Sequence, residues 1–205
     1  MQAKGSSIGL AAPAIVLLAG GEGRRIGGGK PHRRLGGKAL IAHVLPRARL
    51  WSDAVAVAVR EGAGELAAET DILLDDPGIA GPLGGLAAAL RHGAAIGRET
   101  VLTLPCDTPF LPDDLPGRLA SALAEKCAAL AASGGNLHPT CALWLTGAEE
   151  SLEGYLATGR QSLRGFAEHV GHGVAEWPAE PIDPFFNVND AMDLARAEAW
   201  LAGNA

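Results

Sequence analysis

Short apolar runs rich in branched residues alternate with longer segments in which apolar residues recur at helical spacing, over residues 14–126. Each short run is apolar almost throughout, as in strands that are buried on both faces of a sheet. This alternation is typical of repeated βαβ units and predicts an α/β fold with a mostly parallel central sheet and helices on both faces. The predicted strands are 14–19, 54–59, 72–75 and 101–105. The predicted helices are 39–51, 62–69, 82–95 and 113–126.

The pattern is less regular beyond residue 126. Two apolar stretches are predicted at 127–132 and 141–145, and a further strand at 173–177. Three helices are predicted at 148–157, 162–170 and 191–202. Neither an internal repeat nor a linker interrupts the chain. We therefore predict one domain over residues 14–205, preceded by a flexible tail of residues 1–13.

Charge argues for a small anionic ligand rather than a nucleic acid. The chain carries 17 Lys and Arg against 23 Asp and Glu, a net charge of −6, which does not suit a general nucleic-acid-binding surface. The basic residues are concentrated early in the chain. From Glu22 to Arg49 there are eight Lys and Arg residues, and Glu22 is the only acidic residue. An acidic protein with one local cationic patch is suited to binding a small anion.

Cysteine usage and hydropathy favour a cytoplasmic location and predict no membrane-spanning segment. The three cysteines form no CxxC pair, which indicates neither a zinc site nor a disulfide framework and fits a reducing compartment. Pro13 interrupts the apolar run at 8–18, so a secretion signal is disfavoured. No segment approaches the roughly 18 uncharged apolar residues needed to cross a bilayer.

The first predicted strand leads into LAGGEGRRIGGGK, residues 18–30. Its glycines allow backbone N–H groups to approach an anion closely, and its basic residues add charge, which predicts a phosphate-binding loop. A solvated surface loop is the alternative. Pro31 follows Lys30, which excludes a Walker A loop, and Ile26 stands where the dinucleotide fingerprint requires glycine.

Acidic residues follow two other predicted strands, at the sheet edge where ligands bind in open α/β folds. Asp107, after strand 101–105, is a suitable oxygen ligand for Mg²⁺, although an Asp before Thr-Pro is often only a turn former. Asp75 and Asp76 lie at the end of the predicted strand 72–75, and either could cap a turn instead of facing a ligand. Two later acidic pairs predict helix caps without chemistry, Asp113 with Asp114 and Asp190 with Asp193.

The glycine-rich segment followed by LGGKALIAHVL resembles the opening signature of nucleotidyltransferases similar to molybdenum cofactor guanylyltransferase. Four further segments continue the resemblance in order, to about residue 200: DDPGIAGPLGG, PCDTPFLP, GGNLHPTCALW and FFNVND. One departure is Val59-Arg60, where many relatives carry Asn-Arg.

The resemblance implies a Rossmann-like nucleotidyltransferase fold and a set of site residues. It implies catalytic roles for Arg25, Lys30 and Asp107, with Asp107 binding Mg²⁺. It implies nucleotide binding by Leu18, Ala19, Gly20, Gly21, Lys30, Asp107 and Asp75, which we favour over Asp76. It implies acceptor binding by His138, Asn187 and Asn189. Residues 14–126 would form the nucleotide-binding part and 127–205 the acceptor-binding part.

The implied reaction transfers GMP from GTP to molybdopterin or to its molybdenum-bound form, and releases pyrophosphate. Proteins that mature molybdoenzymes are the expected further partners. One alternative is another nucleotidyltransferase of this fold, using CTP on molybdopterin or a nucleotide on a sugar or alcohol phosphate. The other is a non-catalytic nucleotide or cofactor carrier, against which the joint presence of Lys30 and Asp107 argues.

Overall fold

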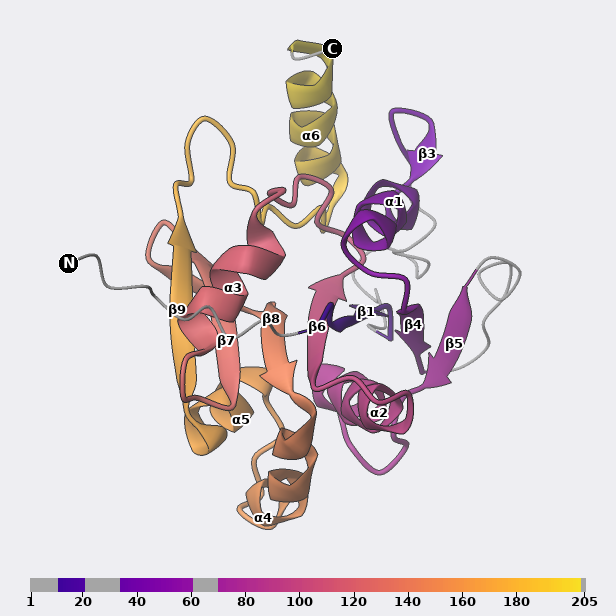
Figure 1. Ribbon diagram of the computed structural model, residues 1–205. Coiled ribbons are helices and arrows are strands. Elements are labelled where there is room, and N and C mark those ends of the chain that lie inside the picture. The colour runs from indigo at the N-terminus through magenta and orange to yellow at the C-terminus, as the bar shows by residue number, and fades with distance from the viewer. Residues whose placement is uncertain (1–10, 21–33, 61–69, 204–205) are drawn as a thin grey trace, which may run out of the picture.

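The computed structural model of the protein describes residues 11–20, 34–60 and 70–203 (Figure 1). A seven-stranded sheet runs through the molecule in the order β5-β4-β1-β6-β8-β7-β9. Its strands are β1 Ala14–Leu18, β4 Val55–Val59, β5 Asp71–Leu74, β6 Thr100–Pro105, β7 Ala128–Ser133, β8 Asn136–Leu145 and β9 His172–Trp177. All neighbouring strands pair in parallel except β8, which is antiparallel to both β6 and β7. The predicted α/β class with a mostly parallel sheet is confirmed.

Helices cover both faces of this sheet, as Figure 1 shows. They are α1 Ile41–Trp51, α2 Pro82–Ala95, α3 Leu115–Leu123, α4 Leu152–Leu156, α5 Leu163–Val170 and α6 Ala191–Gly203, with a 3₁₀ helix, η4, at Thr146–Ser151. Successive β1 residues point to opposite faces. Ile15 packs in the apolar cluster that holds α1 and α3, and Val16 packs in the cluster that holds α2 and α5. No helix among the described ranges is long and apolar enough to cross a membrane.

The elements predicted from apolar periodicity are observed, with shifts at their ends. The stretches at 127–132 and 141–145 form the β7–β8 hairpin, and β8 begins earlier than predicted, at Asn136. The helix predicted at 148–157 is divided between η4 and α4. The helix predicted at 62–69 and most of the tail at 1–13 lie outside the described residues.

A small hairpin was not predicted. Strands β2 (Arg34–Leu35) and β3 (Lys38–Ala39) pair across Gly36 and Gly37, whose φ angles of 55° and 80° suit a tight hairpin turn. Leu35 packs with Val188 and Ala197, so that the hairpin and α6 share a small apolar cluster.

The prediction that Asp113 and Asp114 cap a helix is confirmed only for the position of Asp114, and no side-chain cap forms. Asp114 is the N-cap residue of α3 but its side chain makes no capping hydrogen bond. Pro116 near the helix start lacks an N–H, which removes one of the donors that a cap would satisfy. Asp114 Oδ1 instead accepts a hydrogen bond from Trp177 Nε1 at 2.8 Å, and Asp113 Oδ1 lies 2.5 Å from Arg47 Nη1. These carboxylates tie α3 to β9 and α1.

The predicted cap pair before α6 is confirmed. The Asp193 amide donates to Asp190 Oδ1 at 2.9 Å, and the Asp190 amide donates to Asp193 Oδ2 at 3.2 Å. This reciprocal bonding is a capping box, in which each carboxylate satisfies a backbone N–H that the helix leaves unpaired.

Candidate active site

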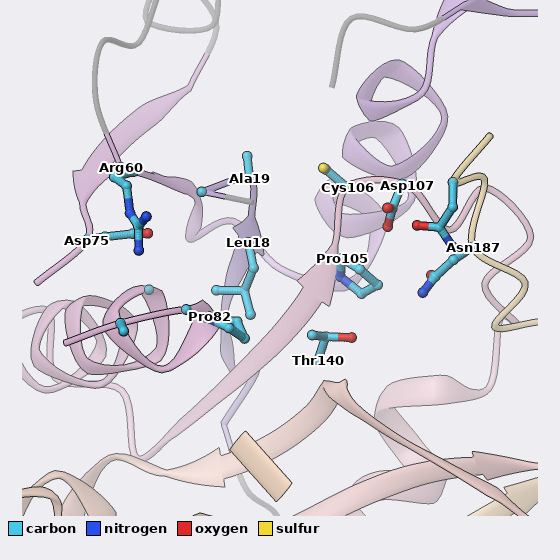
Figure 2. Close-up of a pocket in the computed structure, with 15 residues that line it drawn as sticks. Leu18, Ala19, Arg60, Asp75, Pro82, Pro105, Cys106, Asp107, Thr140 and Asn187 are labelled. Atoms are coloured by element: carbon cyan, nitrogen blue, oxygen red, sulfur yellow. The ribbon is translucent and has the colours of Figure 1, made fainter. Parts of the chain in front are cut away.

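A cavity of about 510 Å³ opens at the carboxyl ends of the central parallel strands (Figure 2). The exits of β1 and β6 and the start of α2 line it, together with three residues from the second half of the chain. Those three are Thr140, Asn187 and Asn189. Figure 2 shows Arg60 and Asp75 on one side of the β1 exit and Asp107 and Asn187 on the other. The cavity therefore has two ends that face different side chains.

The β1 exit packs tightly against Asp75. The Ala19 amide donates to Ala58 O at 2.8 Å, which continues the pairing of β1 with β4 to the mouth of the cavity. A Cβ atom on the next residue, Gly20, would lie 2.1 Å from Asp75 Oδ2. Glycine is required here because the chain passes so close to that carboxylate, and its exposed backbone lies at the cavity wall.

Asp75 and Asp76 have separate roles in the structure. Asp76 caps the turn after β5, since Oδ1 accepts from the Gly78 amide at 2.9 Å and Oδ2 accepts from Arg91 Nη2 at 2.6 Å. Asp75 lines the cavity instead. Of the two aspartates, the one favoured as the nucleotide ligand is therefore the one that faces the cavity.

The Asp75 carboxylate is buried and incompletely satisfied. Its Oδ1 has no hydrogen-bond partner among the residues described by the structure, and only 8% of the residue is exposed. Burial raises the pKa of this carboxyl above its usual value, while the charge of nearby Arg60 acts in the opposite direction. A buried acceptor without a partner costs on the order of 1–3 kcal/mol, so a ligand that donates a hydrogen bond here would be favoured.

Asp107 occupies the turn directly after β6, on the opposite side of the β1 exit from Asp75. The residue is 7% exposed and lines the cavity. Its carbonyl accepts from the Val188 amide at 2.9 Å, and Thr108 Oγ1 donates to Asn187 Oδ1 at 2.6 Å. Two segments far apart in sequence are thus bonded together beside the carboxylate.

The donor set around Asp107 suits magnesium better than a metal held wholly by protein side chains. Within the described ranges, no three His, Cys, Asp or Glu side chains gather to hold a metal ion. Mg²⁺ is commonly bound by one or two carboxylates, with substrate phosphates and water as the other ligands. A single carboxylate in a cavity large enough for a nucleotide fits that pattern.

A register shift in β8 brings Thr140 to the cavity. Leu130 pairs with Ala142, but the next β7 residue, Ala131, pairs with His138. The intervening residues 139–141 therefore have no partner on β7, and the pairing of β8 with β6 also ends at Ala142. Strand β8 diverges from β6 at this bulge, where Thr140 lines the cavity opposite the β6 exit.

His138 lies outside the set of residues that line this cavity. Its Nε2 atom lies 2.7 Å from Ser133 Oγ, and its ring stacks on Phe185 with 4.8 Å between centroids. Asn187 and Asn189, which the sequence groups with His138, do line the cavity. Gly21, Arg25 and Lys30 lie outside the described residues.

Sequence reasoning assigned no role to Arg60 or Thr140. Arg60 directly follows β4, so the rule used for Asp75 and Asp107 would have selected it. It also lines a second cavity of about 500 Å³ that shares Asp75 with the first and extends to Gln161. The placement of Thr140 depends on the bulge in β8, for which the neighbouring Pro139 is the available sequence signal, because proline inside a sheet occurs mostly at edges and bulges.

A mostly parallel sheet with a carboxylate- and glycine-lined cavity at its carboxyl edge defines a Rossmann-like α/β protein, a class that binds its ligands at this edge of the sheet. Residues 15–174 match the model of one family, described as the MobA-like NTP transferase domain. The chain belongs to this family of nucleotidyltransferases.

Named relatives agree with this assignment over nearly the whole chain. A molybdenum cofactor guanylyltransferase of Cereibacter sphaeroides is 40% identical over 191 residues, which cover 93% of this chain and 97% of the relative. The crystal structure of molybdopterin-guanine dinucleotide biosynthesis protein A from Archaeoglobus fulgidus is 26% identical, with a TM-score of 0.75, covering 92% and 98% of the two chains.

The same fold occurs in a cytidylyltransferase. The 2-C-methyl-D-erythritol 4-phosphate cytidylyltransferase from Thermus thermophilus has a TM-score of 0.68 at 21% identity, covering 93% of this chain and 99% of the other. The fold alone therefore does not select the base.

Proposed function

We propose that this protein transfers GMP from GTP to molybdopterin, forming molybdopterin guanine dinucleotide and pyrophosphate. The observation that carries the proposal is that Asp75 and Asp107 face one cavity from opposite sides of the β1 exit. A nucleoside triphosphate has a nucleoside end that donates hydrogen bonds and a phosphate end that binds a metal. The two ends of the cavity suit these two ends of the nucleotide.

The nucleoside binds at the Asp75 end. The unpaired Asp75 Oδ1 accepts a hydrogen bond from a hydroxyl or amine of the nucleoside, which removes the cost of burying that atom alone. Backbone from residues 18–20, with Gly21 from the sequence pattern, holds the nucleotide where β1 ends. The start of α2 at Pro82 lies at the same cavity, and helix N-termini attract anions.

The acceptor binds at the Asp107 end. Asn187 and Asn189 line the cavity and offer amide donors and acceptors, and Asn187 lies on the side remote from Asp75. They belong to the acceptor set that the family resemblance implies, whose third member, His138, lies outside the lining of this cavity. Residues 14–126 would then bind chiefly the nucleotide, and 127–205 chiefly the acceptor.

An oxygen of the acceptor's terminal phosphate attacks the α-phosphorus of GTP in line. The new bond joins this oxygen to the α-phosphorus, and the bond from the α-phosphorus to the pyrophosphate oxygen breaks. No protein nucleophile is needed, so the residues act by positioning and by stabilising charge. Asp107 would hold Mg²⁺, which when bound would supply stabilisation of the negative charge on the phosphates. Arg25 and Lys30 neutralise the same developing charge.

Cytidylyl transfer is the second candidate, because Val59 replaces the Asn that many relatives carry beside the following Arg. The deciding experiment follows the α-phosphate label of GTP and, separately, of CTP onto molybdopterin with Mg²⁺, with a no-acceptor control for each. Transfer from GTP alone supports the proposal. Transfer from CTP alone changes the product, and nucleotide binding without pyrophosphate release supports a carrier.

The cellular setting follows from the same proposal. Within the described part of the chain no disulfide joins the three cysteines, of which Cys106 and Cys141 are buried and Cys127 is partly buried, and this suits a reducing cytoplasm. Proteins that mature molybdoenzymes would receive the product, and no role in nucleic-acid binding is proposed for this acidic chain.

A further inference from the structure

A buried hydroxyl links two parts of the chain beside the Asp107 end of the cavity. Ser133, at the end of β7, is completely buried. Its Oγ donates to Asp183 Oδ1 at 2.8 Å and lies 2.7 Å from His138 Nε2. Asp183 belongs to the segment between β9 and α6, so this chain of three side chains joins that segment to the β7–β8 hairpin.

The protons in this chain can be assigned. A serine hydroxyl has one hydrogen, and Ser133 uses it towards Asp183. His138 Nε2 must therefore carry a hydrogen and donate it to Ser133 Oγ. Burial lowers the pKa of His138, while the charge of Asp183 acts in the opposite direction, so the neutral ring with its hydrogen on Nε2 is the form present at pH 7. The order His138 to Ser133 to Asp183 leaves no nucleophile free, which excludes a hydrolytic triad.

Ring packing holds the same segment. Phe185 is buried between His138, on which it stacks, and Trp177, whose ring it meets edge-on at 5.2 Å between centroids. The Phe185 amide donates to Asp183 Oδ1 at 2.8 Å, and the Phe186 amide donates to the Asp183 carbonyl at 3.0 Å. Asp183 thus fixes the turn that leads into Asn187.

The other end of the segment is bonded to the β6 exit. Val188 donates to the Asp107 carbonyl, and Asn187 accepts from Thr108. Segment 183–189 therefore spans two anchors, the His138–Ser133–Asp183 chain and the Asp107–Thr108 turn. The residues between the anchors include Asn187, and Asn189 follows the second anchor directly.

We propose that Ser133 and His138 are positioning residues, which fix segment 183–189 through Asp183 so that Asn187 and Asn189 meet the acceptor. The acceptor part of this inference rests on the proposed function. His138 acts from behind the segment, through Ser133, instead of touching the substrate.

Three variants separate the hydrogen-bond chain from ring packing. Ser133→Ala removes the link. His138→Phe keeps a ring against Phe185 but removes the Nε2–H donor. His138→Gln has an amide nitrogen that can replace Nε2 as the donor but lacks the ring. The matched control is Thr103→Val, since Thr103 is another buried hydroxyl, which accepts from Trp144 Nε1 and donates to the Ala142 carbonyl.

The first readout is hydrogen–deuterium exchange of the free protein, which does not depend on any reaction. Amides of Phe185 and Phe186 should exchange about tenfold faster in Ser133→Ala and His138→Phe than in the parent, because losing a buried hydrogen bond has an effect of that order. His138→Gln should restore most of the protection, and Thr103→Val should leave these amides unchanged. Unchanged exchange in Ser133→Ala and His138→Phe, or impairment in His138→Gln alone, would overturn the positioning role.

The second readout compares KM for molybdopterin with KM for GTP in the labelled transfer assay. Ser133→Ala and His138→Phe should raise KM for molybdopterin about tenfold while KM for GTP stays within about twofold. Equal rises in both, or no change in KM for molybdopterin despite faster exchange, would refute the link to the acceptor. Should the parent protein transfer no label at all, the proposed function fails, whereas the exchange data still decide whether the segment is positioned in this way.

Discussion

A Cβ atom on Gly20 would lie 2.1 Å from Oδ2 of Asp75, far inside van der Waals contact. Asp75 cannot retreat easily, because it is buried and its other oxygen lies 3.2 Å from where Gly85 would carry a Cβ. The end of β1 and the end of β5 thus define each other's position. The chain at Gly20 can reach the cavity wall because residue 20 has no side chain.

The first prediction concerns this contact. Gly20→Ala should displace the Asp75 carboxylate and lower kcat/KM for nucleotide transfer at least about tenfold. The control is Gly117→Ala in α3, where an added Cβ meets nothing within 4 Å and should stabilise the helix by about 0.5–1 kcal/mol. Steady-state kinetics and thermal melts of both variants test this. Normal activity in Gly20→Ala would show that the Asp75 position does not matter.

The second prediction concerns the charge of Asp75. Its folded pKa is raised by burial, so the folded state binds this proton more tightly than the unfolded state. The contribution of this carboxyl to the free energy of unfolding is therefore fully present below the usual value of 3.8 and is lost as pH rises through the folded pKa. Asp75→Asn, which carries no charge, should raise Tm at pH 7 more than at pH 4.

Activity should move in the opposite direction to stability in that variant. The Asn side chain offers one acceptor oxygen where Asp offers two, and it lacks the charge that faces Arg60. We expect KM for GTP to rise about tenfold while Tm increases, a trade-off common at buried polar sites. Melting curves at the two pH values and GTP saturation curves provide the test. A lower Tm at pH 7 than the parent would contradict the assigned cost of the buried charge.

How much of this site the sequence predicts depends on how local the signal is. The ends of β1, β5 and β6 follow from apolar runs, and so do Asp75 after β5 and Asp107 after β6, because parallel strands place their carboxyl ends at one edge. The difference between Asp75 and Asp76 also has a local cause, because Asp76 accepts a hydrogen bond from the Gly78 amide in the turn that follows. Such neighbours in sequence are neighbours in the fold.

The signals that sequence reasoning missed are non-local. Thr140 reaches the cavity because β8 changes register against β7. Pro139 lies in the unpaired stretch and is a local signal of a bulge, but it does not show which neighbouring residue reaches the cavity. The bond from Ser133 to Asp183 joins residues 50 positions apart. Asp114 occupies the predicted N-cap position, but its side chain accepts from Trp177, 63 positions away, instead of from the helix, and its neighbours alone could not predict that partner. Tertiary partners decide the role of such polar groups after local propensity has placed them.

The third prediction concerns the bond between Thr108 and Asn187. Thr108→Val keeps the side-chain shape but removes the hydroxyl that donates to Asn187 Oδ1 at 2.6 Å. Asn187 loses the bond that orients its amide, so KM for molybdopterin should rise about fivefold to tenfold with little change in KM for GTP. The matched control is Thr158→Val, whose hydroxyl donates to the Tyr155 carbonyl at the end of α4. Equal effects of the two substitutions would remove Asn187 from the acceptor site.

The fourth prediction concerns Asp107 and the metal. Asp107→Asn keeps the shape and the carbonyl that accepts from Val188, but removes the negative charge that would hold Mg²⁺. We expect kcat to fall at least about a hundredfold, with the Mg²⁺ concentration for half-maximal activity shifted upward. Chelation of divalent ions should silence the parent protein, and added Mg²⁺ should restore it.

The control for Asp107 is Asp113→Asn, because Asp113 lies six positions further along the same loop and pairs with Arg47 at the surface. That variant should retain the parent's Mg²⁺ dependence and rate, since exposed ion pairs contribute little. Melting curves establish that Asp107→Asn remains folded, so that any loss of rate belongs to the chemistry. If Asp107→Asn showed the parent's Mg²⁺ dependence, Asp107 would not be the metal ligand. Among the described residues, Asp75 is the other carboxylate that lines the cavity.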